Sequence, residues 1–166
     1  MTIVHVPPRP LWRERFTAAL LRGTLKLLLK PAFSPRVPIP WQRRWLKALA
    51  RITLPLRGTR FEVARVGGVA GEWVHAAPGP TRTGSLLYLH GGAYCVGAPQ
   101  THRALTARLA RATGLALFAA DYRLAPERRF PAAVRGALAA SRALRASGPV
   151  VVAGDSAGGG LALALA

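Results

Sequence analysis

The run PVVVAGDSAGGGLALALA at residues 149–166 constrains the fold of this chain more than any other stretch. It begins with a short apolar segment, continues through glycines and ends in helix formers, an order that predicts a buried strand, a tight turn and a helix. Ser156 lies at the tip of the turn, with Gly154 and Gly158 two residues away on either side. Larger side chains at those two positions would collide as the strand and the helix approach each other, so the pattern indicates a serine held in a sharp strand-to-helix turn.

A plain glycine-rich turn and a phosphate-binding loop are the alternative interpretations of these residues. The phosphate loop is disfavoured because no Lys-Ser or Lys-Thr pair follows the glycines. A helix beginning at Ala157 would direct unpaired amides and its positive dipole end toward the space beside the Ser156 hydroxyl. A developing negative charge on an oxygen would be stabilised there, and Asp155 is expected to support the turn.

The chain from Phe61 onward alternates between strand and helix patterns. Two β-rich runs on either side of Gly67-Gly68 predict a hairpin. Further strands are expected at 85–90, 115–120 and 149–154, and helices at 100–113 and 131–146. Apolar strands separated by helices favour parallel pairing with helices on both faces, so the predicted class is α/β with a mostly parallel sheet.

Two amphipathic helices are expected before this region, at 11–30, where Pro31 ends the helix, and from Pro40 onward. Each has basic side chains on one side and apolar side chains on another. Three roles stay open for them: covering another part of the same protein, gating a substrate site, or contacting a membrane surface.

The net charge of +18 is concentrated at the N-terminus, where residues 1–60 hold 13 of the 24 lysines and arginines and one of the six acidic residues. Such a region could contact anionic lipid, but an arginine-rich solvated face is the alternative, and no nucleic-acid partner is predicted. Cys95 is the single cysteine, which fits a reducing compartment. Without a signal-peptide pattern or a spanning segment, the expected location is the cytoplasm, with peripheral membrane contact as the open alternative.

The predicted parallel strands end in unusual sequences, and the carboxyl ends of such strands meet at one edge of a sheet. His90-Gly91-Gly92 follows the first, where two glycines let backbone N–H groups approach a ligand closely. We expect His90 to be a structural hydrogen-bonding residue. The second strand ends in DYRLAPE, whose charged and aromatic side chains are expected to hold loops in place: Asp121, Tyr122 and Glu127.

These three stretches, in this order, resemble the hormone-sensitive-lipase-like branch of the α/β-hydrolases, a bacterial esterase group with an HGG oxyanion motif, a DYRLAPE segment and a GDSAGG elbow. The resemblance runs from Phe61 to Ala166. It implies an α/β-hydrolase fold with an N-terminal helical cap. We therefore expect residues 1–58 to be the cap region and residues 59–166 to be the hydrolase core.

The resemblance also implies a serine carboxylic-ester hydrolase that acts on short- to medium-chain acyl esters through an acyl-serine intermediate. Ser156 would be the nucleophile, and the backbone amides of Gly91, Gly92 and Ala157 would form the oxyanion hole. No cofactor or metal is implied, and the expected partner is a small-molecule ester.

In this fold the triad acid and base follow the serine along the chain. None of the ten residues after Ser156 is Asp, Glu or His, and the four histidines all precede it. The sequence therefore predicts a core truncated after the elbow, with activity reduced about ten-thousandfold or more in this chain alone. The alternative is a non-catalytic basic remnant that binds a membrane surface or a protein partner.

Overall fold

The structure is a computed structural model that describes residues 12–29, 33–77 and 79–166. The expected end of the first helix at Pro31 lies outside these residues. The chain divides into two compact units, residues 1–42 and 43–166. The cap role predicted for residues 1–58 stays a prediction.

The first unit contains helix α1, Trp12–Leu29, and the first residues of helix α2, Ile39–Ala50. The buried side chain of Gln42 fixes the turn that precedes α2, because its amide donates to the carbonyls of Ser34 and Val37 at 3.2 and 2.8 Å. Both helices occur where the amphipathic patterns predict them.

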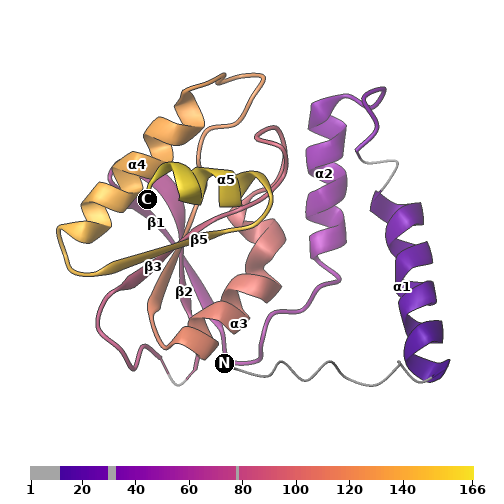
Figure 1. Ribbon diagram of the computed structural model, residues 1–166, viewed down its shortest axis with the longest axis horizontal. Coiled ribbons are helices and arrows are strands. Elements are labelled where there is room, and N and C mark those ends of the chain that lie inside the picture. Colours follow the sequence, from indigo (N-terminus) through magenta and orange to yellow (C-terminus); the bar gives the residue numbers. More distant parts are fainter. Residues whose placement is uncertain (1–11, 30–32, 78) are drawn as a thin grey trace, which may run out of the picture. The chain divides into compact units, whose positions relative to one another are not determined.

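The second unit is built on a five-stranded sheet of order β1-β2-β4-β3-β5 (Figure 1). Its strands are β1 (Arg60–Val66), β2 (Val69–His75), β3 (Ser85–Leu89), β4 (Ala116–Ala120) and β5 (Val150–Gly154). β3 pairs in parallel with β4 and β5, whereas β2 is antiparallel to both β1 and β4. β2 alone among these five runs against the others, which confirms the mostly parallel sheet and the hairpin at Gly67-Gly68.

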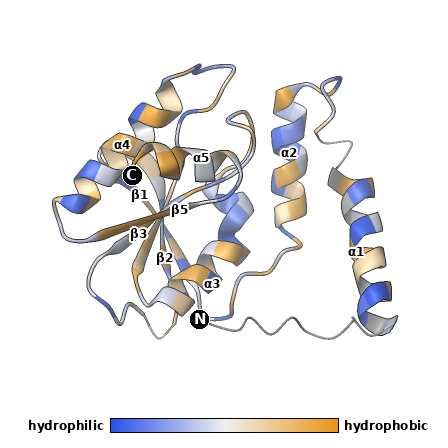
Figure 2. Ribbon diagram, viewed as in Figure 1, coloured by the Kyte–Doolittle hydropathy of each residue, from blue (hydrophilic) through white to orange (hydrophobic). Residues whose placement is uncertain are grey.

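Helices cover both faces of this sheet. They are α3 (Arg103–Thr113), α4 (Ala132–Arg145) and α5 (Ala157–Ala164). Alternate residues of each strand face opposite sides: Leu86 and Leu117 pack toward α3, and Leu87 and Phe118 pack toward α4 and α5. The parallel strands β3 and β5 are correspondingly apolar in Figure 2.

One helix begins later than predicted. The residues expected to open α3 form a separate 3-10 turn, Pro99–His102. The Thr101 hydroxyl accepts a hydrogen bond from the Ala98 amide at 3.1 Å and donates to the Ala98 carbonyl at 2.7 Å. These local side-chain bonds compete with the α-helical pattern, so α3 starts at Arg103.

Candidate active site

Ser156 occupies an exposed turn between β5 and α5, with φ of 49° and ψ of −120°. A positive φ is uncommon for a residue with a side chain, and such conformations cost roughly 1–3 kcal/mol. A Cβ on Gly158 would overlap the Leu89 carbonyl at the end of β3, and a Cβ on Gly154 would overlap the Gly158 carbonyl. The two glycines thus let β5, α5 and the end of β3 meet around the serine.

Asp155 joins this turn to the loop that follows β3. Its Oδ1 accepts hydrogen bonds from the Tyr88 hydroxyl at 2.6 Å and from the Gly91 amide at 2.8 Å. Burial of the Tyr88 phenol, reinforced by its hydrogen bond to Asp155, raises the pKa of Tyr88, so the hydroxyl keeps its proton. Asp155 therefore fixes the serine turn against the end of β3.

The contact with Asp155 changes the predicted set of oxyanion donors. The Gly91 amide, expected to be one of them, is already bonded to a carboxylate and is not free for a substrate oxygen. Among the residues that the structure describes, the amides of Gly92, Ala93 and Ala157 donate to no acceptor. The amides of Gly92 and Ala157 are thus unbonded, and their part in an oxyanion hole stays a prediction. Ala93, which sequence reasoning missed, is the free amide next to them.

His90 and Tyr122 form a buried stack at the end of β3, with ring centroids 4.4 Å apart. His90 Nδ1 donates to the Gly91 carbonyl at 2.8 Å, and the Tyr122 hydroxyl donates to the His90 carbonyl at 2.6 Å. His90 Nε2 is buried without a hydrogen-bond partner within the described residues. Burial lowers the pKa of His90 to about 4, so the ring is neutral at pH 7 and suits the supporting role predicted for it.

His102 is a residue that sequence reasoning did not connect with the site. Its Nε2 lies 3.5 Å from Asp155 Oδ1, and its ring lies 5.7 Å from the ring of His90. Its Nδ1 is 2.8 Å from the Thr101 hydroxyl. No sequence motif includes His102. Its position just before the helix that follows the glycine loop is the one sequence feature that could have placed it near the site.

The DYRLAPE segment is held by an arginine that sequence reasoning also missed. Arg43 of α2 donates to the two carboxylate oxygens of Glu127 at 2.7 and 2.8 Å, and this hydrogen bonding lowers the pKa of Glu127. Partial burial raises the pKa of Asp121, and the charge of Lys47 opposes that rise. Glu127 is thus tied to Arg43, and the supporting role expected from its place in the motif stays a prediction.

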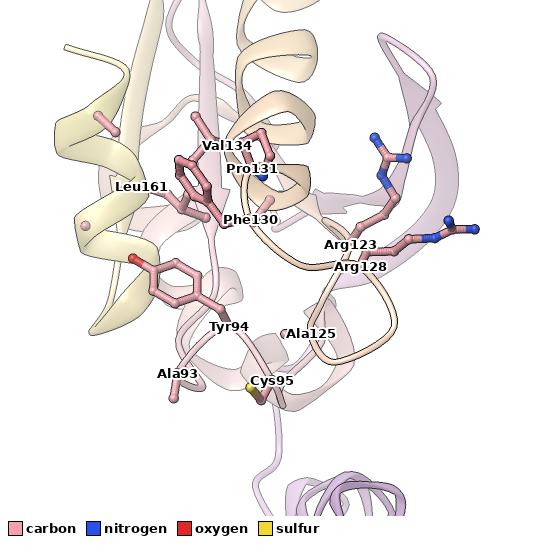
Figure 3. A pocket seen from close by; sticks show the side chains of 13 residues that line it. Ala93, Tyr94, Cys95, Arg123, Ala125, Arg128, Phe130, Pro131, Val134 and Leu161 are labelled. Carbon is pink, nitrogen blue, oxygen red and sulfur yellow. The ribbon is translucent and has the colours of Figure 1, made fainter.

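An apolar cavity of about 410 Å³ lies between the loop after β3, the start of α4 and one side of α5. Figure 3 shows the side chains of Tyr94, Phe130 and Leu161 around it, whereas those of Arg123 and Arg128 extend away from these three. Gly160, four residues after the serine, is part of its wall. An apolar group of moderate size fits this space.

In the part of the chain that the structure describes, no cluster of three or more His, Cys, Asp or Glu side chains could hold a metal ion. No helix within the described ranges has the length and apolarity needed to cross a bilayer.

Comparison with known proteins adds a consistent set of similarities. The family described as alpha/beta hydrolase fold matches residues 86–166. An acetyl-hydrolase of Streptomyces hygroscopicus is 50% identical over 107 residues, which cover 62% of this chain and 35% of that protein. An esterase of Acinetobacter venetianus is 32% identical over 158 residues, which cover 93% of this chain and 50% of that protein.

Solved structures give the same result. A hormone-sensitive lipase from a metagenome library matches with a TM-score of 0.76 and 37% identity, over 87% of this chain and 50% of that one. An esterase from the bacterial hormone-sensitive lipase family matches with a TM-score of 0.77 and 38% identity over the same shares. The chain spans between about a third and a half of the length of the relatives it matches.

Proposed function

Because the chain belongs to the hormone-sensitive-lipase-like branch of the α/β-hydrolases, we propose that it carries the nucleophile and the oxyanion hole of a serine carboxylic-ester hydrolase. The observation that supports this most directly is the strained, exposed turn that presents Ser156 beside free backbone amides. Short- to medium-chain acyl esters are the proposed substrates, with residues 1–58 as the cap region.

The proposed reaction is acyl transfer through the serine. The Ser156 hydroxyl oxygen attacks the ester carbonyl, and the carbonyl oxygen becomes negatively charged. The amides of Gly92, Ala93 and Ala157 bind that oxygen, the alcohol leaves with a proton, and water releases the acid from the acyl-serine. The ten residues after Ser156 include no Asp, Glu or His, so in this proposal they supply neither the general base that accepts the serine proton nor the acid that orients it.

The apolar cavity supports an acyl or alcohol group of several carbons as the part of the ester bound there. Its aromatic and aliphatic lining would bury methylene groups, each stabilised by roughly 0.8 kcal/mol on leaving water. Tyr94 and Gly160 both line the cavity, and a Cβ on Gly160 would lie 2.9 Å from the Tyr94 hydroxyl, so the loop after β3 and α5 meet there, four residues after the serine.

Labelling with a fluorescent alkyl fluorophosphonate, combined with turnover of 4-nitrophenyl butyrate, tests the proposal. The 166-residue chain is compared with the same chain extended by any downstream coding sequence, called the full protein below. Each is tested with Ser156→Ala and with Ser147→Ala, an exposed serine outside the site, as the matched control. We expect labelling and turnover in the full protein, their loss in Ser156→Ala, and little turnover in the 166-residue chain. Absence of both from the full protein would contradict the esterase proposal.

A second candidate function is peripheral contact with anionic membranes, favoured by the surface of α1. Phe16, Leu20 and Leu27 are 67, 60 and 74% exposed. At 100° per residue they share one stripe of the helix, and a basic stripe lies beside it, formed by Arg15, Arg22 and Lys26. This arrangement matches a helix lying in a lipid headgroup layer.

Co-sedimentation with vesicles tests this second proposal. Binding to phosphatidylglycerol vesicles that weakens with salt, and that is lost when Arg15, Arg22 and Lys26 are all changed to glutamine, is the expected result. Equal binding to phosphatidylcholine vesicles, or none to either, would refute it. Ser156→Ala is the control, since it leaves α1 unchanged.

A further inference from the structure

We infer that Arg43 is a positioning residue that holds the loop after β3 in its oxyanion-binding shape, an inference that rests on the proposed function. Its guanidinium bonds to two loops at once. Nε donates to the Cys95 carbonyl at 2.8 Å and Nη2 to the Ala125 carbonyl at 2.8 Å. Nη1 and Nη2 also donate to the carboxylate of Glu127. One side chain thus bridges the loop that follows β3 and the loop that follows β4.

The bridged loop is the one that carries the free amides. The amides of Cys95 and Val96 both donate to the Gly92 carbonyl, at 3.0 and 2.9 Å, which closes residues 92–96 into a tight turn. The Ala125 amide donates to the Tyr94 carbonyl at 2.8 Å, as a direct link between the two loops. Arg43 holds the Cys95 carbonyl at the end of the turn, and the hydrogen bonds from Cys95 and Val96 then hold Gly92.

This turn needs external support because its backbone is strained. Ala93 and Tyr94 have φ values of 51° and 59°, in the left-handed region that residues with a Cβ rarely adopt. Two such residues in succession persist only where surrounding contacts over-determine the backbone. The hydrogen bonds from Arg43 and from the Ala125 amide supply contacts of this kind directly at the strained residues and the residue after them.

Only an arginine has the donors for this geometry. Four hydrogen bonds to three residues require a planar fork, whereas a lysine ammonium is a point charge that reaches fewer acceptors at once. The side chain of Glu127 is 55% exposed, so solvent screens part of its attraction to Arg43 and limits what the pair adds to the free energy of unfolding. Loss of Arg43 should therefore change catalysis more than stability.

The kinetic test uses the full protein with Arg43→Lys, Arg43→Gln and, as the matched control, Arg51→Gln, an exposed arginine just after α2. For 4-nitrophenyl butyrate we expect the kcat of Arg43→Gln to be roughly 10- to 100-fold lower than that of the unmodified protein. This is no more than the smallest loss typical of removing one oxyanion-hole donor. We expect KM to stay within about twofold of the unmodified value. Arg43→Lys should recover only a small part of kcat. The control should match the unmodified protein.

Amide hydrogen exchange provides a readout that does not depend on activity. The amides of Cys95 and Val96 should exchange faster in Arg43→Gln than in Arg51→Gln, with an unchanged unfolding midpoint. Unchanged kcat together with unchanged exchange would overturn the inference, as would losses in kcat that simply follow a loss of stability. If the unmodified protein hydrolyses no ester, the proposed function fails, and exchange at Cys95 and Val96 alone decides whether Arg43 holds the loop.

Discussion

At the scale of single residues, the carbonyl of Leu89 decides what can stand at position 158. A Cβ there would overlap that oxygen, so the end of β3 and the first turn of α5 would have to separate. Gly159 is different, because its added Cβ would meet nothing nearer than the Gly154 carbonyl at 3.4 Å. Of these two adjacent glycines, Gly158 is required by packing and Gly159 is not.

We predict that Gly158→Ala lowers the free energy of unfolding by about 3 kcal/mol or more, through overpacking against backbone. Gly159→Ala should raise it by roughly 0.5–1 kcal/mol, because alanine is the better helix former. Urea unfolding of the two variants checks this. A similar effect at both positions would contradict the packing described at the elbow.

A second residue-scale prediction concerns the buried, neutral ring of His90. Its pKa is lowered from 6.5 to about 4, so between these values the unfolded chain binds a proton that the folded chain does not. Stability from this residue is complete above about pH 6.5 and falls as the pH drops toward 4, by roughly 3 kcal/mol in total. Urea unfolding from pH 7 to pH 4.5 measures the slope. His90→Gln should reduce that slope, and an unchanged slope in His90→Gln would contradict the prediction.

At the scale of elements, the cavity is defined by side chains from separate segments. Leu161 forms a buried part of its wall, whereas Phe130 is 88% exposed and lines it from the start of α4. We predict that Phe130→Ala in the full protein raises kcat/KM for 4-nitrophenyl octanoate relative to the butyrate by roughly 10-fold, because a longer chain gains room to bury methylenes. Phe33→Ala, an exposed phenylalanine of the first unit, is the control. An unchanged ratio in Phe130→Ala would place the acyl chain elsewhere.

Elements and their local order were predictable from the sequence because they depend on neighbouring residues. Apolar runs predict the strands, Gly67-Gly68 predicts the hairpin turn, and the glycines around Ser156 predict the elbow. The late start of α3 was not predicted, since the Thr101 hydrogen bonds follow from the loop conformation rather than from periodicity.

Contacts between distant elements were not predictable in the same way. Arg43 and Glu127 are 84 residues apart, and nothing in either segment indicates the other. The competition of Asp155 for the Gly91 amide likewise depends on where β3 and β5 end side by side. Motif spacing specifies the chemistry of the loop, but the register of the sheet decides which of its amides stays free.

At the scale of the whole chain, β5 lies at one side of the sheet, and β3 is its one paired neighbour among the described strands. Val151 on this strand is 53% exposed. Apolar edge strands template association with other chains. We predict that Val151→Lys lowers the self-association of the 166-residue chain, measured by analytical ultracentrifugation, and changes its free energy of unfolding by less than about 0.5 kcal/mol. Unchanged self-association would show that this edge is not the contact surface. The control is Leu54→Lys, at a leucine outside the sheet that is 78% exposed.

The position of β3 between β4 and β5 also has a consequence for synthesis on the ribosome. β3 leaves the ribosome before either of its neighbours, and it shares no hydrogen-bonded edge with the hairpin that precedes it. Only when β4 emerges can the hairpin and β3 join one sheet, because β4 pairs with both. Until then the nascent chain holds an extended apolar strand with two open edges, the kind of segment that chaperones bind. The time between the emergence of β3 and the emergence of β4 therefore sets how long that strand waits for its first partner.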